Sequence, residues 1–263
     1  MRFITAAIIV LAGELTASAV RAQSPGVDEL MRRVATYVQS FVDTFSNVVA
    51  EERYEQELAG RRRQLTSDFL LVAYPGRDNR FLTFRDIRAV DGQPVKDQSD
   101  RITQLFLKPF DSAVGRATEI QLEGLRHTLS GGRLVNPLTV LTLLQREYQK
   151  EYRFTRQGLD PTLGPGIRRI DVIRLRPPLN SQPRGSVWVF EATGEVLRTL
   201  WRIVGSESTT TTFEVDRELR IRVPIRMEDE TGDFRGRATY SNFRRFNVRA
   251  ESTIDAPAST TPR

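Results

Sequence analysis

Carboxylate side chains are the residues of this 263-residue sequence best suited to chemistry, because closely spaced acids can serve as a general acid and a base. They occur as Glu51-Glu52, as Asp86 and Asp91, and as Glu228-Asp229-Glu230. A glycosidase needs two carboxyl groups flanking one bond. Adjacent residues of a strand point to opposite faces, and Glu228 and Glu230, which share a face, fall at a predicted strand end. We interpret these acids as solvated and predict that the protein is not an enzyme, with a carboxylate-dependent hydrolase as the least favoured alternative.

Other nucleophiles, bases and metal ligands are scarce. The sequence has no cysteine, which excludes disulfides, iron–sulfur clusters and thiol catalysis. His127 is the only histidine and falls near the end of a predicted helix, where the helix dipole favours a cation. The Thr209–Thr212 run is typical of a strand with a solvated face rather than of a nucleophile. We predict no catalytic residue, no metal and no cofactor.

The charge balance is basic, with 39 Lys and Arg against 33 Asp and Glu and a formal net charge of +6. The arginines are interleaved with acids, and Arg61-Arg62-Arg63 is the one tight run. A nucleic-acid surface gathers its charge on one face or helix, so we expect no nucleic-acid partner. A weak attraction to anionic lipid head groups, and with it a peripheral membrane contact, stays open.

Residues 1–22 have the pattern of a signal peptide. Arg2 precedes an apolar run over residues 3–11, and Val20-Arg21-Ala22 is a small-x-small cleavage site before Gln23. An uncleaved anchor helix is the alternative. We expect a periplasmic or secreted protein cleaved near Ala22/Gln23, with a single domain over residues 23–250. The Ser-, Thr- and Pro-rich residues 251–263 are expected to be a disordered tail.

Hydrophobic periodicity divides the chain into helical and extended segments. Apolar residues at three- and four-residue steps predict a long N-terminal helix over residues 27–53. A helical middle follows, with predicted helices at residues 99–107, 112–129 and 137–144.

Period-two alternation before and after that middle predicts strands. They are expected at residues 54–59, 64–74, 80–91, 152–157, 167–176, 186–190, 195–204, 208–215, 220–230 and 234–248. Turns are predicted at Asp91-Gly92, Ala192-Thr193-Gly194 and Thr231-Gly232-Asp233. Strands, then helices, then strands indicate an α+β protein. A large antiparallel sheet of this size should curl into a half-barrel, with the helices packed on its concave face.

Three segments of the last third carry a resemblance to a known family. The hairpin Ser186–Arg198, the proline-containing Val223–Met227 and the closing Tyr240–Phe246 resemble strands of LolA/LolB/RseB-like periplasmic proteins. The mature chain as a whole also looks like an uncharacterised family of exported bacterial proteins. The first resemblance implies a half-barrel whose concave face holds acyl chains or a lipidated partner.

Large apolar residues are the candidates for such a site. They either fill the core or line an apolar cavity between the sheet and the helices: Trp188, Phe190, Trp201, Phe213 and Phe243 on the strands, Phe41 and Phe45 on the first helix, and Leu138 and Leu141 on the last. The helix over residues 137–144, next to Gly131-Gly132, is a candidate lid together with Phe110 and Val114. The leading hypothesis is an envelope protein that binds an apolar ligand, such as a lipid or a lipoprotein acyl chain. The alternative is a scaffold whose partner is another envelope protein.

Overall fold

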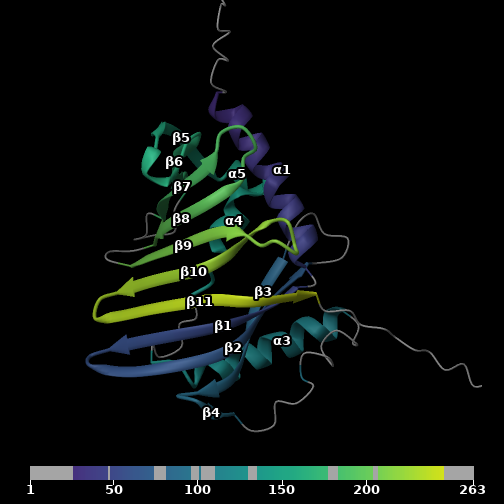
Figure 1. Cartoon of the computed structure of the whole chain (residues 1–263), viewed down its shortest axis with the longest axis vertical. Coiled ribbons are helices and arrows are strands. Elements are labelled where there is room, and N and C mark those ends of the chain that lie inside the picture. The colour runs from purple at the N-terminus through teal and green to yellow at the C-terminus, as the bar shows by residue number, and fades with distance from the viewer. Residues whose placement is uncertain are drawn as a thin grey trace, which may run out of the picture.

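The computed structural model describes residues 26–46, 48–73, 81–95, 101, 110–129, 135–176, 183–203 and 207–245 (Figure 1). Within these residues one antiparallel sheet carries helices on one face. The helices are α1 (Val27–Phe45), α3 (Phe110–Leu125), α4 (Thr139–Leu144), α5 (Arg146–Gln149) and the short 3-10 helix η1 (Pro161–Leu163).

The sheet has eleven strands in the order β4-β3-β2-β1-β11-β10-β9-β8-β7-β6-β5. Strands that follow one another along the chain are neighbours in the sheet, except that β4 and β5 form its two opposite edges and the first strand pairs with the last. The strands are β1 (Val48–Leu58), β2 (Arg61–Ala73), β3 (Phe81–Val90), β4 (Gln93–Pro94), β5 (Tyr152–Leu159), β6 (Ile167–Arg174), β7 (Arg184–Phe190), β8 (Val196–Arg202), β9 (Ser208–Val215), β10 (Arg222–Thr231) and β11 (Phe234–Arg245). The predicted α+β class with one large antiparallel sheet is therefore confirmed.

The long N-terminal helix is shorter than predicted. It ends at Phe45, and the predicted helical residues from Val48 onward form β1 instead. The prediction failed there because Val48 and Val49 continue the helical apolar spacing, while the inward positions of β1 include the polar Glu52 and Gln56, which hide the alternation of a strand.

The predicted turns are confirmed by backbone geometry. Asp91 and Gly92 both have positive φ, at 49° and 79°, as a tight hairpin that matches the twist of its strands requires. Gly194 and Gly232 also have positive φ, at 78° and 55°. Predicted strand ends differ from the observed ones by a few residues, and α5 was not predicted.

The core lies between the sheet and helices α1 and α4. We call the face of the sheet that α1 and α4 cover the inner face and the opposite one the outer face. Apolar side chains from α1, α4 and nearly every strand form one buried cluster there. Figure 1 shows α4 behind the strands, and α1 crosses the sheet obliquely. Helix α3 packs against β3, near the edge of the sheet that β4 forms.

Several predictions lie outside the described residues. These are the signal peptide over residues 1–22, nearly all of the helix over residues 99–107, Gly131-Gly132, Phe246 and the tail over residues 251–263. The side chains of Phe110 and Val114 also fall outside the description.

Candidate functional site

Five of the nine candidate cavity residues lie in the filled core of the inner face. Phe41, Phe45, Leu138, Leu141 and Phe213 are all at most 2% exposed and belong to the one buried cluster. The rings of Phe41 and Phe45 are stacked with centroids 5.1 Å apart. These side chains pack against one another and not around a described space.

Two further candidates lie at the margins of that core. Trp201 meets Tyr152 edge-on at 6.2 Å between ring centroids, and Gly185 lies opposite it on β7. A Cβ atom on Gly185 would stand 2.6 Å from the Trp201 ring, so the indole packs closely against this glycine. Phe243 is half-buried and meets Phe45 edge-on at 6.1 Å.

Trp188 and Phe190 are turned to the outer face, because they alternate with the inward Val187 and Val189 of β7. The Trp188 indole Nε1 donates a hydrogen bond to Asp160 at 2.9 Å. The guanidinium groups of Arg169 and Arg198 lie over the Trp188 ring at 5.8 and 5.4 Å. The expectation that Trp188 packs beneath the helices is thereby corrected, since strand alternation places it on the other side of the sheet.

A buried polar cluster interrupts the apolar inner face, and sequence reasoning missed it. Glu52 and Arg85 are 0% and 4% exposed and form a two-point ion pair, with Arg85 Nη2 2.6 Å from Glu52 Oε1. Arg85 also donates to the carbonyl of Val135 at 3.0 Å and lies 5.4 Å over the Tyr54 ring. Tyr54 in turn donates to Asp229 at 2.8 Å.

The electrostatics of this cluster follow from burial. Desolvation is the largest cause that raises the pKa of Tyr54, and the nearby carboxylate of Asp229 adds to it. The pKa of Tyr240 is also raised well above its usual value, first by burial and then by the charge of Glu52. Burial works to lower the pKa of the charged Arg85, but the charge of Glu52, its hydrogen bond to Arg85 and the nearby Tyr240 and Tyr54 together outweigh it and raise that pKa. The cluster is therefore a fixed ion pair between two neutral tyrosines.

Four of the remaining candidate acids lie within 4.0 Å of an arginine: Glu51, Asp86, Asp91 and Glu228. Asp68 and Asp86 are cross-strand neighbours on β2 and β3. Burial raises the pKa of Asp86, Arg101 at 3.9 Å opposes this, and the charges of Asp68 and Glu123 reinforce it. Asp68 itself contacts Arg244 at 3.0 Å. Neither acid lines any of the described hollows.

The lone histidine has a backbone contact only. The His127 carbonyl accepts a hydrogen bond from Arg63 at 2.9 Å, just after the end of α3. Among the described residues no group of three or more His, Cys, Asp or Glu is arranged to hold a metal ion.

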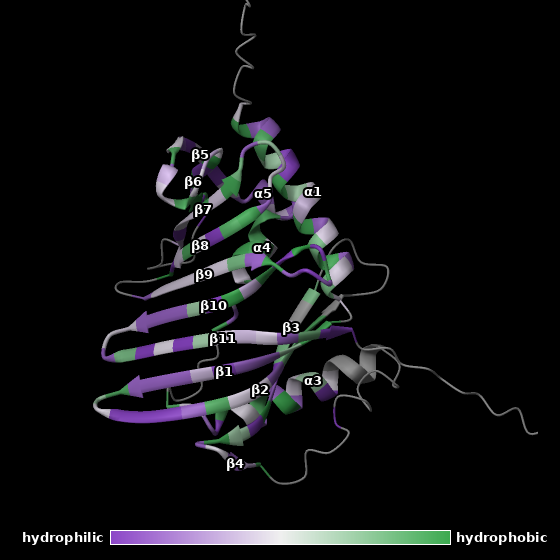
Figure 2. Ribbon diagram, viewed as in Figure 1, coloured by the Kyte–Doolittle hydropathy of each residue, from purple (hydrophilic) through white to green (hydrophobic). Residues whose placement is uncertain are grey.

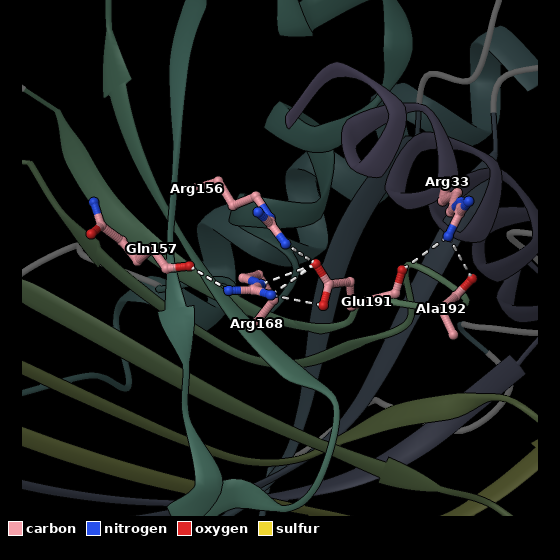
Figure 3. A network of polar contacts seen from close by, with 6 residues as sticks. All are labelled: Arg33, Arg156, Gln157, Arg168, Glu191 and Ala192. Carbon is pink, nitrogen blue, oxygen red and sulfur yellow. Dashed lines mark hydrogen bonds and ion pairs between the residues drawn. The ribbon is translucent and has the colours of Figure 1, made fainter. Parts of the chain in front are cut away.

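The turn between β7 and β8 is held by a network around Glu191 (Figure 3). Arg168 contacts both carboxylate oxygens of Glu191, at 2.9 and 2.8 Å, and Arg156 joins the same carboxylate. Desolvation works to raise the pKa of Glu191, but the hydrogen bonds from Arg168 and Arg156 outweigh it and lower that pKa. Arg33 of α1 donates to the carbonyls of Glu191 and Ala192, both at 3.2 Å.

The turn requires a glycine at position 194 because the backbone of α1 lies too close for a side chain. A Cβ atom there would stand 2.5 Å from the backbone of Arg33 and Val34, so α1 rests directly on the turn. The N-terminal half of α1 thus packs on Glu191–Gly194, which is part of the hairpin Ser186–Arg198 that resembles the LolA/LolB/RseB-like proteins.

The described hollows are mostly polar. The largest, about 630 Å³, lies at the β1–β2 and β10–β11 hairpins among charged side chains that include Glu57, Arg63 and Asp229. Figure 2 shows the same ends of β1, β2 and β10 as hydrophilic. A second hollow of about 370 Å³ lies beside Phe243, and a third of about 60 Å³ lies beside Phe69 and Arg85. Within the described part of the chain, no helix is long and apolar enough to cross a membrane.

Comparison with known proteins gives structural likenesses only. No family model and no curated protein matches the chain. A DUF1329 family protein from Desulfovibrio piger is 14% identical with a TM-score of 0.40, over 83% of this chain and 92% of that one. A protein from Vibrio parahaemolyticus described as an outer membrane lipoprotein-sorting protein domain is 12% identical with a TM-score of 0.44, over 83% and 95%. That description is of the kind that the sequence resemblance names. The fold described above rests on this chain's own sheet order and packing.

Proposed function

We propose that this chain is a non-catalytic binding protein of the cell envelope that works through the surface of its sheet. Glu52, Asp68 and Glu228 are paired with arginines and Asp229 accepts a hydrogen bond from Tyr54, and the described part of the chain offers no metal cluster. The envelope location is part of the proposal, supported by the signal-peptide pattern of residues 1–22.

The observation that carries the proposal is that most candidate cavity residues are packed in the core: Phe41, Phe45, Leu138, Leu141 and Phe213 are at most 2% exposed and line none of the described hollows. Sites for small ligands occupy about 300–1,000 Å³ and are mostly apolar. Among the described hollows, the one with the most apolar lining, beside Phe69 and Phe84, has a volume of about 60 Å³. The larger described hollows are edged by charged side chains. This geometry favours the scaffold hypothesis over an open apolar cavity.

A carrier of apolar ligands is the second candidate, and α4 is the observation that favours it. The helix has six residues and no side-chain cap at Leu138, and a helix so short has little stability of its own. It contributes Val140, Leu141 and Leu144 to the core. If α4 moved away, a ligand would take the place of these side chains against Phe41 and Phe213.

Two measurements separate the candidates. Native mass spectrometry is run on protein purified from the periplasm without detergent, before and after incubation with envelope lipids. Hydrogen exchange then reports how the amides of α4 open. An unchanged protein mass, with α4 exchanging only on global unfolding, supports the sheet-surface proposal. A bound mass that organic extraction identifies as lipid, with α4 opening well below the global free energy, replaces it with the carrier.

A further inference from the structure

The outer face of β5–β8 carries an uneven charge. Because directly paired residues share a face, the strand registers place five arginines and one aspartate at outward positions there: Arg153, Arg169, Arg184, Arg198, Arg202 and Asp171. Arg169 pairs with Asp171 at 2.9 Å. The outward charge of these four strands is therefore strongly positive.

Four of these arginines make no ion pair with a described acid. Within the described residues, Arg153, Arg184, Arg198 and Arg202 make neither an ion pair within 4.0 Å nor a side-chain hydrogen bond. Arg198 lies over the Trp188 ring, and its Nε is buried without a hydrogen-bond partner. Their guanidinium donors are available to an anion.

The other half of the outer face is neutralised internally. Arg226 and Arg237 share Glu228, at 2.5 and 3.4 Å. Arg53 pairs with Glu55 at 3.7 Å, and Arg62 pairs with Glu57 at 3.4 Å. The positive excess is thus a local property of β5–β8 and not a general consequence of the basic composition.

Exposed aliphatic side chains lie among the unpaired arginines. One register row runs Arg153, Ile173, Arg184 and Arg202 across four strands. Ile173 is 38% exposed, and Leu175, two residues further on, is 53% exposed. We call the outer patch the five residues Arg153, Ile173, Leu175, Arg184 and Arg202.

We propose that the outer patch is a docking surface for a membrane that bears anionic phosphate head groups. Arginine pairs with phosphate through several donors at once. Its aliphatic stem can lie along apolar lipid while its guanidinium group stays among the phosphates. Exposed isoleucine and leucine add apolar area that enters the head-group region. A row of arginines that contains an exposed aliphatic residue, with a second one beside it, fits such an interface.

The inference deepens the proposed function by naming what the sheet surface meets, and it does not depend on whether a ligand lies under α4. Vesicle binding and lipid extraction are separate measurements. If vesicle binding fails while the mass spectrum stays clean, the membrane proposal falls and a protein partner remains.

The test is sedimentation of the full chain with phosphatidylglycerol–phosphatidylcholine vesicles and with phosphatidylcholine vesicles, each at low and high salt. We expect binding to the anionic vesicles alone, weakened by salt because the attraction between exposed charges is screened. Each basic residue near an anionic surface contributes about fivefold in binding. The triple variant Arg153→Gln/Arg184→Gln/Arg202→Gln should therefore bind on the order of a hundredfold more weakly.

A matched variant removes the same charge from the other half of the outer face: Arg53→Gln/Arg226→Gln/Arg237→Gln. It should keep binding within about threefold of the parent, since those arginines already have acids beside them. Arg153→Lys/Arg184→Lys/Arg202→Lys should retain most of the binding, because charge is the main attraction. Ile173→Ser/Leu175→Ser should weaken binding without changing its salt dependence.

Three results would overturn the proposal. One is the absence of binding to anionic vesicles at low salt. Another is an equal loss in the two charge-matched glutamine variants, each shown by thermal denaturation to be folded. The third is binding to a soluble polyanion such as heparin without binding to vesicles.

Discussion

Replacing Glu52 by leucine would leave Arg85 charged and buried without its partner. Both side chains are almost fully buried, and Arg85 contacts Glu52 through two nitrogens. Removing one member of such a pair costs about 3–5 kcal/mol, because the remaining charge has lost the contacts that replaced its hydration. In a domain of this size that corresponds to a midpoint of thermal unfolding lower by roughly 10 °C.

The double variant Glu52→Leu/Arg85→Met tests the reasoning itself. It removes both charges and keeps apolar volume, so its stability should return to within about 2 kcal/mol of the parent. Urea denaturation measures the free energies of unfolding for the two single variants and the double variant, which together form a double-mutant cycle. Glu57→Gln is the control, because Glu57 pairs with Arg62 at an exposed position and should change stability by less than about 0.5 kcal/mol.

The reasoning fails if Glu52→Leu costs less than about 1 kcal/mol, since the pair would then be reached by water. It also fails if the double variant loses as much as the two single variants added together. That result would show that each side chain matters for its own packing and not for the pairing of charges.

Three further outcomes are expected, each measured by denaturation. Gly194→Ala should cost at least about 2 kcal/mol, whereas Gly60→Ala, with a similar positive φ but nothing within 4 Å of its Cβ, should cost only about 1 kcal/mol; equal costs would refute the close approach of α1. Glu191→Gln should cost about 2 kcal/mol at pH 7 and less at pH 3, because the lowered pKa of Glu191 contributes stability above its unfolded value near 4.3 that is lost as the pH falls; a cost independent of pH would contradict this. Phe41→Ala should cost about 3–5 kcal/mol if the inner face is filled, while Val215→Ala, at an exposed position, should change little; a small loss at Phe41 would indicate free space there.

Local sequence patterns were sufficient for most strands and turns of this protein. Alternation over β9 predicted its observed bounds, and Asp91-Gly92 predicted a tight turn because both positions tolerate positive φ. The same local signals failed at β1, where Val48 and Val49 fit a helix as well as a strand. What decides there is the pairing of β1 with β2 and β11, and β11 lies nearly two hundred residues further along the chain.

The sequence did not predict whether each candidate residue fills the core, lines a cavity or lies on the outer face. The predicted cavity residues were correctly identified as large and apolar, but whether Phe41, Phe45 and Phe213 line a space or fill it depends on how α1 and α4 pack. Trp188 went to the outer face because of the register of β7, which composition does not reveal.

By itself, the sequence determined the class of fold, the order of helices and strands, and the chemistries that a chain without cysteine and with one histidine does not supply. Only the tertiary structure decided that Glu52 and Arg85, thirty-three residues apart, form a buried ion pair, and that four arginines on the outer face of β5–β8 make no ion pair within the described residues. The physical reason is that both depend on register between strands. Register is set by many packing and hydrogen-bond contacts acting together across the sheet, and no single stretch of sequence contains them.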